Sequence, residues 1–168
     1  MHWHIETLGF TLTNNDVLRL VRSALFIKEN HIVKIFALAN SNVSANQVAQ
    51  WLNKDNDSNA KMSDSKLASF LNGLIIDKRG ARDGEQPKPE AHLNNNMIFQ
   101  KLRIALNLKT EDMLNILETV GIELTKYELG AYFRKPDNKH YKQCDDETLR
   151  EFLFGVKLQS NPDATLED

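Results

Sequence analysis

Apolar residues recur at helical spacing along most of the chain, and the same set of stripes occurs twice. In the first half, four stripes follow the i, i+3, i+4, i+7 spacing of one helix face: Val17, Val21 and Leu25; Ile32, Ile35 and Phe36; Val48 and Trp51; Leu67, Phe70, Leu71 and Leu74. Matching stripes begin at Ile98, Met113, Leu129 and Leu149. The pattern predicts an all-α protein in which each half contributes four helices.

The two halves are copies of one sequence. Segment 14–54 aligns without a gap with 95–135, an offset of 81 residues, and 64–73 aligns with 146–155 after a one-residue insertion. Two copies are too few for an open solenoid, which needs about three repeats to bury a continuous core. We therefore expect two four-helix repeats that pack on each other with pseudo-two-fold symmetry.

The repeats are expected to occupy residues 12–76 and 93–158. The segment between them, 77–92, has two glycines, two prolines and almost no apolar residues, which is typical of an exposed linker. Residues 1–11 form an N-terminal extension whose alternating apolar residues permit a short strand. The free edge of such a strand would favour a homodimer. Residues 159–168 are polar and acidic, and we expect a disordered tail there.

Polar residues at the helix starts occupy equivalent positions in the two copies. The asparagine pairs 14–15 and 95–96 precede the first stripe of each copy, where their side chains can accept hydrogen bonds from the free N–H groups of the opening turn. Asp64 and Asp146 precede the fourth stripe, where a carboxylate also favours the positive end of the helix dipole. We expect all of them to cap helices.

Two further pairs of equivalent residues suggest structural roles. Arg22 and Arg103 lie beside core residues, and each is expected to bond a carboxylate or a helix-end carbonyl of its own copy. Gly73 and Gly155 lie inside the fourth stripe, where glycine costs about 1 kcal/mol relative to alanine. This cost predicts close helix contact at the glycines, with the floor of a ligand groove as the alternative.

Three long segments resemble a known protein family. They are FLNGLIIDKRG (70–80), LNNNMIFQKLRIALNLKTEDML (93–114) and FRKPDNKHYKQCDDETLREFL (133–153), which are similar to the bacterial YehS-like family. Members of this family are small proteins made of two tandem copies of a domain of unknown function. The resemblance covers residues 12–158. It implies an all-helical, soluble bacterial protein without an assigned activity, and it supplies no catalytic residues.

Charge and composition exclude several classes of protein. The 21 Lys and Arg residues against 23 Asp and Glu give a net charge of -2, so the overall field does not attract nucleic acid or anionic lipid. One cysteine excludes an intramolecular disulfide and a Cys-rich zinc site. The sequence has no apolar run of about 18 residues and no signal-peptide layout, so we expect a cytoplasmic protein without a membrane partner.

One segment of the second copy is locally basic. Residues 126–142 carry five Lys or Arg residues against Glu128 and Asp137, a net +3, whereas the equivalent 45–61 is neutral. Its candidate binding residues are Lys126, Tyr132, Arg134, Lys135, Lys139, His140, Tyr141 and Lys142. This cluster favours a non-catalytic binding or adaptor module whose partner is a protein with an acidic surface.

Two other functions stay open. The second and third helices of each copy resemble a helix-turn-helix, which would indicate a nucleic-acid-binding protein. That alternative is not favoured, because the third helix of the first copy has only Lys54 as a cation and specific DNA binders neutralise about 6 to 10 phosphates. The third hypothesis is a small-molecule sensor with a pocket between the repeats, near Gly73 and Gly155.

No motif of an enzyme or metal site occurs in the sequence. It lacks a Gly-rich phosphate loop and the patterns H-E-x-x-H, G-x-S-x-G and C-x-x-C, so we expect no enzyme activity and no cofactor. His140 and Cys144 precede the acidic residues 145–147. We interpret these acids as the start of a helix and Cys144 as a partly buried residue, with neither a metal site nor a nucleophilic thiol.

Overall fold

The computed structural model describes residues 10–56 and 60–165, and every regular element in these ranges is helical. The first copy contains α2 (Asn14–Leu25), α3 (Glu29–Leu38), α4 (Ala45–Leu52), the short 3-10 helix η1 (Lys54–Asn56) and α5 (Asp64–Arg79). The second contains α6 (Asn95–Ala105), α7 (Thr110–Thr119), α8 (Lys126–Ala131) and α9 (Asp146–Ser160). The predicted all-α fold with four α-helices per copy is confirmed.

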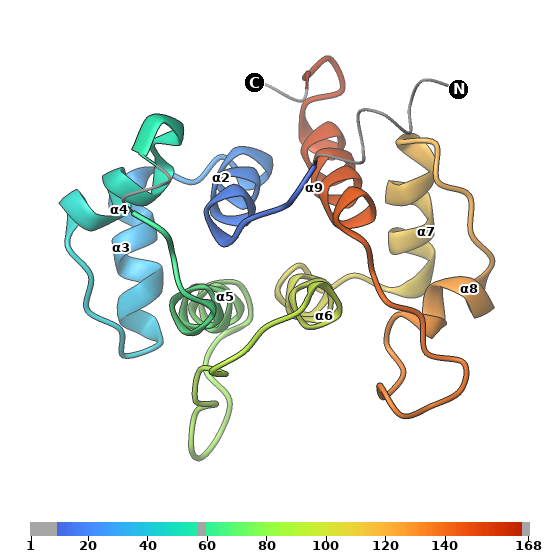
Figure 1. Cartoon of the computed structure of the whole chain (residues 1–168), viewed down its shortest axis with the longest axis horizontal. Helices are drawn as coiled ribbons and strands as arrows, with labels where there is room; N and C mark the ends of the chain where they lie inside the picture. Colours follow the sequence, from blue (N-terminus) through green and yellow to red (C-terminus); the bar gives the residue numbers. More distant parts are fainter. Residues whose placement is uncertain (1–9, 57–59, 166–168) are drawn as a thin grey trace.

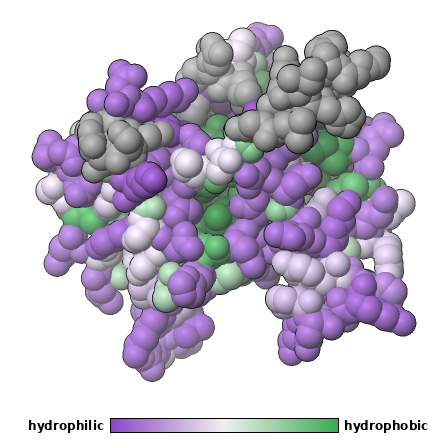
Figure 2. Space-filling model, viewed as in Figure 1, coloured by the Kyte–Doolittle hydropathy of each residue, from purple (hydrophilic) through white to green (hydrophobic). Residues whose placement is uncertain are grey.

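The two copies pack on each other through their first and last helices. In Figure 1, α2, α5, α6 and α9 occupy the centre, with α3 and α4 at one end and α7 and α8 at the other. The last helix of the first copy, α5, packs against α6, and the first helix of that copy, α2, packs against α9. Each copy therefore offers its first helix to the last helix of the other, as a pseudo-two-fold axis requires. Apolar residues are visible at the junction of the two halves in Figure 2.

Asp64 and Asp146 connect the two copies and are not the caps predicted from the sequence. The N-caps of α5 and α9 lie one residue earlier, at Ser63 and Asp145. Asp64 Oδ2 accepts a hydrogen bond from the backbone N–H of Leu93 at 2.9 Å. Asp146 Oδ2 accepts one from the N–H of Leu12 at 3.0 Å. The two carboxylates thus form reciprocal bonds across the junction.

The paired asparagines hold loops. Asn14 and Asn95 donate to the carboxylates of Asp64 and Asp146, each at 2.7 Å. The buried Asn15 donates to the carbonyls of Trp51 and Ala60 and accepts from the N–H of Met62. Asn96 makes the equivalent three bonds, to Tyr132, Lys142 and Cys144. The caps of α2 and α6 are instead Thr13 and Asn94. These asparagines fix the segment between the third and fourth helices of each copy.

Gly73 and Gly155 lie where two helices of the same copy touch. A Cβ atom on Gly73 would overlap the carbonyl oxygen of Ile35 in α3, and one on Gly155 would lie 2.8 Å from the carbonyl oxygen of Ile116 in α7. Both contacts are internal to a copy. The two glycines therefore do not line a pocket between the repeats, contrary to the location that the sensor hypothesis assumed.

The connecting segments differ from their predicted bounds. Helix α5 continues to Arg79 and α9 to Ser160, beyond the predicted ends of the repeats at residues 76 and 158, because the helical backbone hydrogen bonds continue past the last apolar residues. Residues 161–165 contradict the disordered tail: Ala164 is buried, and the buried Lys157 Nζ donates to the carbonyl of Thr165 at 3.4 Å. Residues 10–13 form no strand, and the rest of the predicted strand lies outside the described residues.

Candidate binding site

The predicted basic segment forms α8 and the turn that follows it, and most of its cations are exposed. Lys126 forms an exposed ion pair with Glu111 at 3.2 Å. The guanidinium of Arg134 lies 5.2 Å from the centre of the Tyr127 ring, and the His140 ring meets the same ring edge-on at 5.8 Å. Tyr127, which the sequence analysis did not select, is 56% exposed between these two candidates.

The eight candidate residues do not form one continuous surface. Tyr132 is only 4% exposed and packs edge-on against Phe99 in the core, and the ammonium of Lys142 lies 5.4 Å above its ring. Lys135 and Lys139 are exposed on the turn. The candidates divide between this basic turn and a groove beside it, and the small exposed part of Tyr132 belongs to the groove.

An inter-repeat groove of about 430 Å³ lies between α5, α6, the linker and the turn after α8. Tyr132, Arg134 and Tyr141 line it from the turn, together with Asn72 of α5, Lys101 of α6 and Glu90 of the linker. Apolar side chains complete the walls, among them Ile75, Met97, Ile104 and Phe133. The groove thus brings three of the predicted residues together with three polar residues that the sequence analysis did not select.

A partly buried polar network lines the inter-repeat groove. Lys101 Nζ donates to Asn72 Oδ1 at 2.7 Å and forms an ion pair with Glu90 Oε2 at 3.0 Å. Among the residues that line the groove, three buried atoms have no hydrogen-bond partner in the described part of the chain: Asn72 Nδ2, Glu90 Oε1 and Arg134 Nε. An unsatisfied buried polar group costs about 1–3 kcal/mol. The groove therefore presents two donors and one acceptor that a ligand can satisfy.

The duplication shows that this network is not required by the fold. The residue equivalent to Asn72 in the second copy is Phe154, and the residue equivalent to Lys101 in the first copy is Leu20. The α2–α9 contact thus has apolar residues at the two positions where the α5–α6 contact has a buried amide and a half-buried ammonium. The same helix pairing forms with either set.

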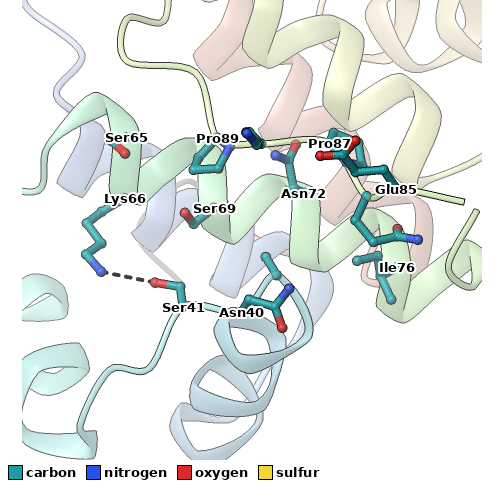
Figure 3. Close-up of a pocket in the computed structure, with 13 residues that line it drawn as sticks. Asn40, Ser41, Ser65, Lys66, Ser69, Asn72, Ile76, Glu85, Pro87 and Pro89 are labelled. Carbon is teal, nitrogen blue, oxygen red and sulfur yellow. Dashed lines mark hydrogen bonds between the residues drawn. The ribbon is translucent and has the colours of Figure 1, made fainter.

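A second cavity of about 510 Å³ lies along α5 on the side of the α3–α4 turn. It is bordered by that turn, by α5 and by linker residues 85–89, and it shares Asn72 and Pro87 with the inter-repeat groove. Figure 3 shows Ser65, Lys66, Ser69 and Asn72 following one another along α5, with Ser41 and Asn40 facing them from the turn. Polar atoms make up a larger share of its lining than of the lining of the groove.

The two equivalent arginines have different surroundings. Arg103 lies over the Phe133 ring at 4.7 Å and donates to the Leu108 carbonyl and the Thr110 hydroxyl, both at 3.4 Å. The side chain of Arg22 is exposed and has no hydrogen bond or ion pair with any described residue, so its predicted bond is absent. The residue equivalent to Phe133 is Leu52, which offers no aromatic face to hold a guanidinium.

The thiol of Cys144 is in an unreactive setting. Burial, together with the neighbouring carboxylates of Asp145 and Asp146, raises its pKa to about 12. Reactive cysteines need the opposite environment, which stabilises the thiolate. In the described part of the chain, no three His, Cys, Asp or Glu residues are grouped so that they could hold a metal ion.

The third helices present few cations. Helix α8 has six residues, and its one basic residue, Lys126, is paired with Glu111. Helix α4 contains no Lys or Arg. Neither helix therefore offers the row of phosphate contacts expected of a recognition helix. Among the described helices, none combines the length and the apolar character needed to span a bilayer.

Comparison with known proteins agrees with the duplicated architecture. The profile of a family described as "Protein of unknown function (DUF1456)" matches residues 14–80 and again 95–160. The chain belongs to the DUF1456 family. It is 43% identical over 153 residues to "Uncharacterized protein YehS" of Escherichia coli (strain K12), and the match covers 89% of this chain and 97% of that protein. The resemblance to the YehS-like family is thus confirmed. No solved structure matches the chain. The DUF1456 description names no activity, so function must be argued from the site.

Proposed function

We propose that this DUF1456 protein is a non-catalytic cytoplasmic binding module whose inter-repeat groove takes an acidic peptide segment of a partner protein. The observation that supports this proposal is the set of three unpartnered buried atoms, Asn72 Nδ2, Arg134 Nε and Glu90 Oε1. An extended peptide presents both carbonyl oxygens and N–H groups, so it can accept from the two donors and donate to the carboxylate.

The rest of the groove suits such a segment. Phe133 and Tyr141 are half-buried and Ile104 is 40% exposed, so apolar side chains of a peptide can lie against them. The exposed Lys135 and Lys139 lie on the same turn as Arg134. A cationic rim favours an acidic segment and increases its association rate.

Selection from a library of random peptides tests the proposal directly. We expect enriched peptides to combine Asp or Glu with an apolar residue. Their dissociation constants are then measured by fluorescence anisotropy for the wild type, for Arg134→Asn and for Arg22→Asn as a matched control. Asn is the residue that the first copy carries, at Asn53, in the position equivalent to Arg134. Loss of the Arg134 bond should weaken binding about tenfold, and the exposed Arg22 should change it less than about twofold.

Two outcomes contradict peptide binding in the groove. One is equal affinity of the Arg134→Asn and Arg22→Asn proteins for the selected peptides. The other is the enrichment of peptides without acidic residues. Binding of single- or double-stranded nucleic acid that falls steeply between about 50 and 300 mM salt would favour the nucleic-acid alternative instead.

A further inference from the structure

The cavity on the first copy has a different chemistry from the inter-repeat groove. We name it the polar pocket and define it by Asn40, Ser41, Ser65, Lys66, Ser69 and Asn72 (Figure 3). Three hydroxyls, two amides and one ammonium group belong to this set. The linker residues Glu85 and Lys88 also line it, so the charges at the pocket are two cations and one anion.

Several donors in the polar pocket have too few acceptors. Lys66 Nζ donates to Ser41 Oγ at 3.0 Å, and no carboxylate within the described ranges forms an ion pair with it. Ser69 is only 5% exposed, and its hydroxyl makes no hydrogen bond to another described residue. Asn72, also 5% exposed, keeps its Nδ2 unpartnered. In Figure 3 its amide lies toward the linker at Pro87 and Pro89, at the edge of the same cavity. The Lys66 ammonium and the Ser69 hydroxyl can therefore donate to a ligand rich in acceptors.

The second copy again provides an internal comparison. The positions of Ser41, Ser69 and Asn72 carry Ile122, Glu151 and Phe154 there, and that of Lys66 carries Thr148. All four replacements are half-buried in the second copy. Because the second copy forms the same helices with these residues, the polar set of the first copy is not needed for folding. It is a local property of the first copy.

We propose that the polar pocket binds a small organic phosphate monoester, with its phosphate oxygens accepting from Lys66 and Ser69. Ammonium, hydroxyl and amide donors all bind phosphate oxygens, and the bonds to a charged oxyanion are the strongest of their kind. The cavity of about 510 Å³ lies within the range of small-molecule sites, about 300–1,000 Å³, so it has room for the organic part of the ligand. This inference does not rest on peptide binding in the inter-repeat groove.

Isothermal titration of the full-length protein tests the proposal with defined probes. Glycerol 3-phosphate is the phosphate monoester and ribose is the neutral control, both at constant ionic strength. The variants are Lys66→Thr, which introduces the residue of the second copy, and Ser69→Ala. Lys78→Thr is the matched control, because it removes the same charge from an exposed position on α5 outside the polar pocket.

We expect glycerol 3-phosphate to bind the wild type and ribose not to bind. Lys66→Thr should weaken the binding about tenfold and Ser69→Ala about threefold, while Lys78→Thr stays within about twofold. Circular dichroism and the unfolding temperature establish that each variant is folded. The proposal is overturned if the wild type does not bind glycerol 3-phosphate at about 10 mM. Equal effects of Lys66→Thr and Lys78→Thr, or ribose binding as tight as that of the phosphate, would also overturn it.

Discussion

A single added methyl group at Gly73 should separate two helices of the first copy. A Cβ atom there would overlap the carbonyl oxygen of Ile35 and lie 2.8 Å from its carbonyl carbon and 3.1 Å from its Cγ2. Two of these three atoms belong to the backbone, so a change of rotamer cannot relieve the overlap. Helix α3 must move away from α5, and the apolar contacts between them must open.

The magnitude follows from two opposing effects. Overpacking a core costs about 1–3 kcal/mol, occasionally more, and a backbone overlap belongs at the upper end of that range. Alanine recovers about 1 kcal/mol of helix propensity. We therefore expect Gly73→Ala to lower the free energy of unfolding by about 2 kcal/mol. At Gly155 the nearest atoms of Ile116 are 2.8 Å away and one belongs to its side chain, so the net loss should be about 1 kcal/mol.

Gly130 provides the matched control. It lies within α8, and no atom would come within 4 Å of an added Cβ. Gly130→Ala should therefore raise the stability by about 0.5–1 kcal/mol. Urea unfolding followed by circular dichroism measures all three variants at an unchanged m-value. If Gly73→Ala were as stable as the wild type, or if Gly130→Ala lost as much stability as Gly73→Ala, the argument from helix contact would be refuted.

Three further predictions concern an amide, a carboxylate and a thiol. Asn15→Ala removes three hydrogen bonds to backbone groups and should lower the free energy of unfolding in urea by about 2–4 kcal/mol. A loss below about 0.5 kcal/mol would contradict the role of these bonds. Hydrogen bonds from Asn14 and Leu93 lower the pKa of Asp64 in the folded protein. The ionised carboxylate therefore stabilises the fold fully above the pKa that Asp64 has in the unfolded chain, and this stabilisation is lost as the pH falls through the lower pKa of the folded state. Asp64→Asn should flatten the decline of the unfolding temperature between about pH 5 and 3, and an unchanged slope would contradict this. Because the pKa of Cys144 is about 12, thiol reagents at about pH 8 should label it only as fast as the protein unfolds, and rapid native labelling would contradict its burial.

The fold could be predicted from the sequence because its signals are repeated. Apolar spacing indicates which face of each helix is buried, and the second copy provides an independent reading of the same pattern. The roles of Asp64 and Asp146 could not be predicted in this way. Each follows a residue that also caps helices, Ser63 and Asp145. Their partners, the N–H groups of Leu93 and Leu12, are 29 and 134 residues away in the sequence. Sequence alone does not show which of two adjacent polar residues caps the helix and which one forms the long-range hydrogen bond.

The candidate site was predictable only in part. Charge located the basic turn after α8, but Tyr132 was selected as a binding residue although most of its side chain is buried against the core. Helix α8 is a short helix of six residues, too few for its apolar spacing to separate the two faces. A pocket between the repeats was one of the hypotheses, but its position and most of its lining residues were missed because its walls come from four separate segments. A comparison of the copies at Asn72 and Lys101 would have pointed to it, since polar residues replace large apolar ones there.

The difference between the two inter-repeat contacts is what argues for a function. Both contacts arise from the same duplicated helices, so the α2–α9 contact shows that Leu20 and Phe154 are compatible with this packing. Stability alone favours such apolar residues, because a buried ionic network is often no better than hydrophobic residues of similar size. The α5–α6 contact instead keeps Lys101 beside Asn72, whose Nδ2 has no partner within the described chain. The unpartnered Nδ2 of Asn72, at a position where the α2–α9 contact has Phe154, is the reason that we propose a ligand supplying the missing acceptor.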